Sequence, residues 1–221
     1  MKKQFMVIGL GRFGSSLTKT LIANGHEVLA VDKDEHAVQE MAAVATHALQ
    51  ADCTDEAVLR ELGASNFTHA IVSIGEDLQS SILTTLLLKE LNIPTVIAKA
   101  KNDMHGRVLK KVGADQIVYP ERDMGTRLAN QISSNNLIDY IELSPEHNLV
   151  ELKAPPSMDG LSLKKLNIRA NYGCTIMAIK KEQDINVSPK AEDEIHTGDI
   201  LLIIGSNDEI RHLEKDYERK R

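Results

Sequence analysis

Residues 4–14 read Gln-Phe-Met-Val-Ile-Gly-Leu-Gly-Arg-Phe-Gly, and this stretch decides the fold of the chain. A short apolar run leads into Gly9, Gly11 and Gly14, and an amphipathic segment follows. The first glycine permits a tight turn, the second lets a pyrophosphate approach the backbone, and the third lets a helix pack closely on the strand. The N–H groups and dipole of that helix would face the phosphates. The stretch therefore predicts a strand, a phosphate-binding loop and a helix.

An acidic residue follows the next apolar run at the position that a bound nucleotide requires. The run Glu27–Val31 ends at Asp32, 18 residues after Gly14. In dinucleotide-binding folds an acid at this place hydrogen-bonds the adenosine ribose, and it suits NAD better than NADP, whose 2′-phosphate it repels. Because the glycines, the flanking elements and the acid agree, we expect a nucleotide site rather than a structural turn.

Strand-like runs alternate with amphipathic segments through the first half of the chain. The runs are Phe5–Ile8, Glu27–Val31, His47–Gln50, His69–Ser73, Thr95–Lys99 and Gln116–Tyr119. Six strands alternating with helices predict an α/β fold with a Rossmann-like, doubly wound parallel sheet. The rhythm ends after Tyr119, where Pro120 opens a helix that we expect from about Glu121 to Ser133.

The pattern changes to short strands beyond Ser144. The expected strands are Asn148–Lys153, Cys174–Lys180, Ile185–Val187 and Ile200–Gly205, with helices near Ser162–Ala170 and after Asn207. We therefore predict three parts: a Rossmann-like nucleotide-binding domain over residues 1–120, bridging helices over 121–143, and a smaller α+β ligand-binding domain over 144–221.

Composition excludes several classes of protein. The 221 residues are 42% hydrophobic, enough for one full core and a smaller second one. A net charge of −6 gives no basic surface for nucleic acid. A charged leader before an apolar run and a membrane-spanning apolar stretch are both lacking, so we expect a cytoplasmic protein. Cys53 and Cys174 are too few for a metal cluster or a disulfide framework.

The sequence offers no catalytic residues. The eight histidines are scattered and none has a zinc-binding spacing, while Ser73 and Ser188 lack a nucleophile-elbow context. A dehydrogenase needs a proton donor beside the nicotinamide and normally a sizeable substrate domain. We therefore expect a binding protein and no enzyme, with an NAD(H)-dependent oxidoreductase or redox sensor as the alternative.

Four charged residues near the predicted loop are candidate ligand contacts. For three of them a structural role is the alternative. Arg12 can pair with phosphate oxygens or be a solvated arginine of the first turn. Glu121 can complement a helix dipole, or serve a metal or cross-subunit contact near the phosphates. Asp52 can border the adenine or cap the helix that begins near Asp55. Lys99 ends the fifth strand, beside the crevice where ligands bind. The predicted nucleotide contacts also include Phe13, Lys33, Cys53, Ile74 and Gly75.

Several stretches together resemble one family, the cytosolic regulatory subunits of bacterial Ktr potassium uptake systems, of the KtrC and KtrA kind. They are Val7–Gly14, Glu27–Asp32, Leu83–Leu91, Gly113–Asp115, Tyr119–Gly125 and Arg169–Cys174. The resemblance implies an RCK-N (TrkA-N) domain and an RCK-C (TrkA-C) domain. It also implies homodimers that assemble into an octameric gating ring, peripheral on the inner face of the membrane beneath a potassium-translocating subunit. ATP and ADP would compete for the first domain, and ATP would favour conduction.

The same resemblance assigns roles to individual residues. Arg12 would reach a γ-phosphate bound in a neighbouring subunit, Asp32 would hold the ribose, and Glu121 would lie at the dimer interface near a Mg²⁺, Na⁺ or Ca²⁺ ion associated with ATP. Inhibitory cyclic di-AMP would bind between two RCK-C domains. The matching positions are Ile168, Arg169, Thr175, Ile176 and Pro189. For Ile168, Ile176 and Pro189, packing in the core or in the dimer is the alternative.

Overall fold

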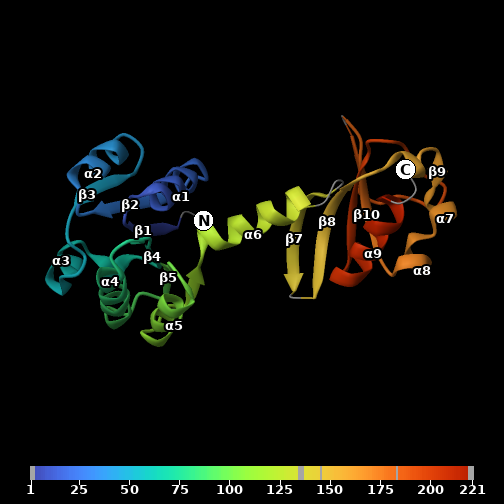
Figure 1. Ribbon diagram of the computed structural model, residues 1–221. Helices are drawn as coiled ribbons and strands as arrows, with labels where there is room; N and C mark the ends of the chain where they lie inside the picture. Colours follow the sequence, from blue (N-terminus) through green and yellow to red (C-terminus); the bar gives the residue numbers. More distant parts are fainter. Residues whose placement is uncertain (1–2, 134–136, 145, 183, 219–221) are drawn as a thin grey trace. The chain divides into compact units, whose positions relative to one another are not determined.

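The structure, a computed structural model, describes residues 3–133, 137–144, 146–182 and 184–218. The chain divides into two compact units, Met1–Arg122 and Asp123–Arg221, named here the N-terminal and C-terminal units. Figure 1 shows a sheet with helices in each of them.

The N-terminal unit contains a six-stranded parallel sheet. Its strands are β1 (Gln4–Ile8), β2 (Glu27–Asp32), β3 (His47–Gln50), β4 (His69–Val72), β5 (Thr95–Lys99) and β6 (Gln116–Val118). The spatial order β3-β2-β1-β4-β5-β6 confirms the predicted Rossmann-like sheet. The order reverses between β1 and β4, and ligands of such sheets bind at the carboxyl ends of the strands beside this switch point.

Helices cover both faces of this sheet. They are α1 (Arg12–Ala23), α2 (Glu35–Ala42), α3 (Glu56–Glu61), η1 (Ala64–Asn66), α4 (Leu78–Glu90) and α5 (Asp103–Lys111). Figure 1 shows α1 and α2 on one side and α4 and α5 on the other. Successive residues of β1 therefore enter different cores: Val7 packs on the side of α1 and α2, whereas Met6 and Ile8 pack on the side of α3, α4 and α5.

The bridging segment differs from its prediction. Helix α6 runs from Pro120 to Ser133, but Leu137–Ser144 form strand β7 rather than part of a bridging helix. The stretch is rich in β-branched and aromatic residues, and it pairs antiparallel with β8 (His147–Lys153). This pairing depends on tertiary structure, which a local sequence pattern does not reveal. The prediction of a helix over residues 137–143 was therefore wrong.

The C-terminal unit is built on a five-stranded antiparallel sheet of order β11-β10-β13-β8-β7. Its other strands are β10 (Thr175–Lys180), β11 (Ile185–Asn186) and β13 (Ile200–Ser206), and β9 (Leu161–Ser162) pairs separately with β12 (Glu194–Ile195). Its helices are η2 (Pro156–Met158), α7 (Leu163–Leu166), α8 (Ile168–Tyr172) and α9 (Asn207–Glu218). Leu201 and Ile203 of β13 join Leu213 of α9 in one buried core.

The single helix expected near Ser162–Ala170 is two helices. Asn167 takes a left-handed conformation (φ 44°) that ends α7 and precedes α8. Asparagine tolerates this conformation better than most residues, so the break falls there.

Candidate nucleotide-binding site

The glycine loop after β1 requires glycine at two positions and leaves space at a third. Gly9 has a φ of +94°, and a Cβ there would lie 3.0 Å from the Ser73 carbonyl carbon. A Cβ on Gly14 would overlap the carbonyl oxygen of Gly9. At Gly11 a Cβ would meet nothing within 4 Å, so this backbone stays open to an approaching ligand.

The N-terminus of α1 is suited to an anion. Helices α2, α3, α4 and α5 are each capped by a side chain, from Asp34, Asp55, Asp77 and Asn102. Helix α1 has Gly11 as its N-cap and no side-chain cap. The first turn of a helix carries N–H groups without intrahelical partners, and a phosphate satisfies them well.

Asp32 connects the end of β2 with the glycine loop. Its Oδ2 accepts a hydrogen bond from the Leu10 N–H at 2.5 Å, and its Oδ1 accepts one from the Asp34 N–H at 2.9 Å. The carboxylate therefore lies beside the loop, where a ribose can reach it.

A cleft of about 260 Å³ opens at the carboxyl ends of the strands. Eight of the predicted contact residues line it: Gly9, Gly11, Asp32, Lys33, Asp52, Cys53, Ile74 and Gly75. The prediction missed further lining residues that follow β3 and β4, among them Thr54, Ser73, Glu76, Asp77, Ser80 and Thr84. For the loop residues among them the available signal was a position at or shortly after the end of a predicted strand, where ligands bind. Ser80 and Thr84 lie on α4 and carried no such signal.

Asp52 does not cap the helix that follows it. It accepts hydrogen bonds from the Thr54 hydroxyl at 2.7 Å and the Thr54 N–H at 2.9 Å, and these bonds lower the pKa of its carboxyl. The cap of α3 is Asp55, which accepts from the Ala57 N–H at 2.8 Å. Asp52 is thus an exposed, ionised residue that lines the cleft.

Cys53 contributes shape rather than reactivity. Its side chain is buried, and burial raises the pKa of its thiol to about 12. A thiol with this pKa is neutral at physiological pH and is a poor nucleophile.

Charged residues gather beside the first turn of α1. Lys99 Nζ donates to Glu121 Oε1 at 2.6 Å and lies 5.9 Å from the Phe13 ring centroid. The hydrogen bond from Lys99, with the positive charge of Arg12 as a smaller cause, lowers the pKa of Glu121. The structure therefore brings Lys99, Glu121 and Phe13 together, with Arg12 near enough to act on Glu121.

A second ion pair beside the cleft, between Lys101 and Glu76, was not predicted. Lys101 Nζ donates to Glu76 Oε2 at 3.0 Å, and this bond is the main reason why the pKa of Glu76 is lowered. Lys99 and Arg12 lower it further, so Glu76 lies within the same positive field.

The residues predicted to contact cyclic di-AMP differ in their surroundings. Ile168 is 4% exposed and belongs to the core of the C-terminal unit, and Ile176 packs against that core. Thr175 and Pro189 are half-buried, and Arg169 is exposed on α8. Packing within the unit thus accounts for the two isoleucines, whereas Arg169 presents a charge to solvent.

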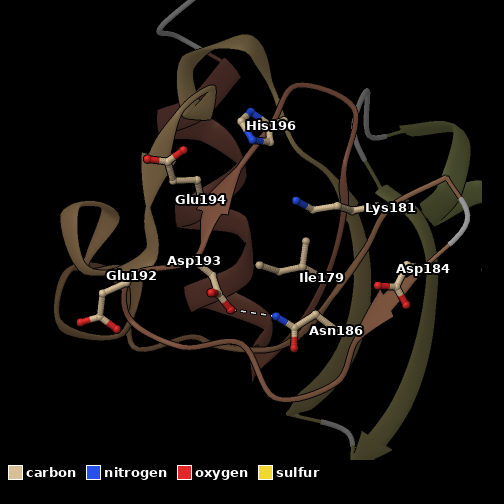
Figure 2. A pocket seen from close by; sticks show the side chains of 8 residues that line it. All are labelled: Ile179, Lys181, Asp184, Asn186, Glu192, Asp193, Glu194 and His196. Atoms are coloured by element: carbon tan, nitrogen blue, oxygen red, sulfur yellow. Dashed lines mark hydrogen bonds between the residues drawn. The ribbon is translucent and has the colours of Figure 1, made fainter.

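A cavity of about 440 Å³ in the C-terminal unit has a predominantly acidic lining (Figure 2). It is lined by Ile179, Lys181, Asp184, Asn186, Glu192, Asp193, Glu194 and His196. Asn186 Nδ2 donates to Asp193 Oδ2 at 2.8 Å. The lining contains four carboxylates and one lysine, so this cavity disfavours a ligand with two phosphates, and none of the five positions above lines it.

The described residues contain neither a metal cluster nor a membrane-spanning helix. No group of three or more His, Cys, Asp or Glu side chains among them is placed to hold a metal ion. Within the same residues, no helix has the length and apolar character needed to cross a membrane.

Comparison with known proteins gives matches over both units. Residues 5–120 match the TrkA-N domain family and residues 149–216 match the TrkA-C domain family. The chain is 55% identical to Ktr system potassium uptake protein C and 51% identical to Ktr system potassium uptake protein A, both of Bacillus subtilis (strain 168). Each alignment covers 97% of this chain, and 97% and 96% of the respective relatives.

Solved structures support the fold. The GsuK RCK domain matches with a TM-score of 0.69 and 19% identity, covering 97% of this chain and 47% of that one. A structure described as the GsuK channel bound to NAD also matches with a TM-score of 0.69 at 19% identity, covering 97% of this chain and 39% of that one.

Proposed function

Since this chain belongs to the KtrA- and KtrC-like RCK subunits of Ktr potassium uptake systems, we propose that it is a regulatory subunit that nucleotides control. It gates potassium uptake through a membrane Ktr potassium-translocating subunit. The observation that carries the proposal is the N-terminus of α1, which lacks a side-chain cap and lies beside Asp32 at the mouth of a cleft. A phosphate and a ribose fit these two features together.

ATP and ADP compete for this cleft, and ATP favours conduction. A ligand shifts a conformational equilibrium only by its differential affinity for the two states. Arg12, exposed at the first turn of α1, provides this difference by pairing with a γ-phosphate bound in a neighbouring subunit. A coupling of about 1–3 kcal/mol per site is usual, and about 5.5 kcal/mol moves an equilibrium from 1:99 to 99:1, so a few sites suffice.

The subunits form homodimers that assemble into an octameric ring at the cytoplasmic face of the membrane. Glu121 is the residue that would hold a cation near the ATP phosphates. Because the described residues offer no cluster of three metal-binding side chains, such a cation (Mg²⁺, Na⁺ or Ca²⁺) takes most of its ligands from phosphate oxygens and water. Cyclic di-AMP inhibits through the C-terminal unit, where Arg169 offers an exposed charge.

The alternative is an NAD(H)-dependent oxidoreductase or redox sensor. Asp32 suits the ribose of NAD. However, no histidine lines the cleft within the described residues, and the thiol of Cys53 is neutral. Among the described residues the cleft therefore offers binding groups, and neither a histidine nor a reactive thiol for catalysis.

Three measurements test the proposal. Calorimetry with ATP, ADP and NAD measures binding, and spectrophotometry with NADH and candidate acceptors measures turnover. Potassium flux through the subunit reconstituted with its membrane partner measures gating. We expect binding of ATP and ADP, flux that ATP stimulates, and no turnover of NADH. Steady NADH oxidation, or a flux indifferent to both nucleotides, contradicts the proposal.

A further inference from the structure

Lys99 occupies an unusual position for a lysine. It is the last residue of β5, and its side chain is only 13% exposed. A Cβ on Gly75 would lie 3.5 Å from its Nζ, and the centroid of the Phe13 ring lies 5.9 Å from the same atom. The ammonium is therefore enclosed by the loop after β4, the first turn of α1 and the start of α6.

Glu121 is the hydrogen-bond partner that the structure records for this ammonium. A buried charge is costly unless it is paired. Glu121 meets that need with one short bond of 2.6 Å, although its own side chain is 65% exposed. The carboxylate thus loses little hydration in the pair, while Lys99 depends on a partner.

A nucleotide phosphate would compete with Glu121 for Lys99. The phosphates lie at the first turn of α1 if the glycine loop binds them, and Phe13 of that turn neighbours Lys99. Phosphate oxygens accept charge-assisted hydrogen bonds as carboxylates do, and they carry more charge. The ammonium has three donors, but two anions that share it repel each other. The repulsion favours a state in which the phosphate holds Lys99 and the exposed carboxylate of Glu121 turns to water.

We propose that Lys99 is an exchangeable partner, which passes from Glu121 to a phosphate of the bound nucleotide and releases the Glu121 carboxylate. This inference rests on the proposed nucleotide site. Glu121 is the second residue of α6, which continues past the boundary between the two units at Arg122. The exchange therefore changes the electrostatic environment of the first turn of the helix that leaves the N-terminal unit.

The exchange predicts that Glu121 opposes nucleotide binding when no divalent cation is present. Glu121→Gln removes the competing charge, so calorimetry with ATP in EDTA should give an affinity about threefold higher than that of the parent. Glu56→Gln is the matched control, because Glu56 forms a 2.6 Å ion pair with Arg60 outside the cleft. The control should bind ATP as the parent does. An unchanged or lower affinity in Glu121→Gln overturns the inference.

A second variant separates exchange from simple repulsion. In a protein that carries Lys99→Met, no ammonium can pass from Glu121 to the phosphate. The increase in ATP affinity caused by Glu121→Gln should then fall well below threefold. A gain of the same size in that background overturns the role of Lys99. Thermal unfolding of every variant confirms that each is folded. If the parent itself binds no ATP, the proposed function fails, which is a different outcome from either result above.

Discussion

The carboxylate of Asp32 and the backbone N–H of Leu10 are 22 residues apart in the chain and 2.5 Å apart in the structure. This bond ties the glycine loop after β1 to the end of β2, the neighbouring strand in the sheet. The residue predicted to hold the ribose is thus also the residue that positions the phosphate-binding loop.

Asp32→Asn should weaken ATP, ADP and NAD together. All three share the adenosine ribose, and a hydrogen bond to a charged group contributes about 1.5–3 kcal/mol, so each dissociation constant should rise about tenfold or more. Calorimetric titration with each ligand checks this. An effect on one ligand alone would show that the three do not share a ribose position.

Two glycines of the loop should respond differently to alanine. Gly14→Ala should destabilise the protein by about 2 kcal/mol, because the new Cβ overlaps the Gly9 carbonyl oxygen. Gly11→Ala meets no neighbour, so it should change stability far less while reducing nucleotide affinity. Urea unfolding and calorimetry measure the two effects. Equal stability losses would mean that the close contact at Gly14 relaxes without cost.

Arg12→Ala should reduce ATP affinity more than ADP affinity and should abolish the stimulation of potassium flux by ATP. The variant keeps the glycine loop and Asp32, which hold both ligands, and loses the contact that distinguishes them. Lys19→Ala removes an exposed positive charge further along the same helix and should leave both properties unchanged. Full ATP stimulation in Arg12→Ala would return this arginine to the role of a solvated first-turn residue.

Arg169→Ala should weaken cyclic di-AMP binding while ATP affinity stays near its parental value, because the two ligands use separate units. Loss of a phosphate pair is the physical cause. Arg211→Ala is the control, since Arg211 is exposed on α9 and pairs with Asp208 at 2.5 Å. Binding is measured with labelled dinucleotide. Equal binding by Arg169→Ala and the parent moves the assignment to another surface.

The sequence by itself determined the first fold unit and the outline of its site. The runs of β-branched and apolar residues, the glycine spacing from Gly9 to Gly14 and the acid at Asp32 are local patterns, and each has a local physical cause. A sheet built from such repeated units has few possible arrangements, so the predicted order of elements was sufficient to place the cleft at the strand ends.

Only the tertiary structure decided which distant residues meet. Strand β7 exists because it pairs with β8, and a sequence pattern cannot reveal a partner's register. Lys99 ends β5 and Glu121 follows β6, and their ion pair arises because these two strands lie side by side. Secondary-structure propensities depend on residues that are close in the chain, whereas hydrogen bonds and charge interactions depend on residues that are close in space. The order of the strands in the sheet decides which residues distant in the chain become neighbours in space.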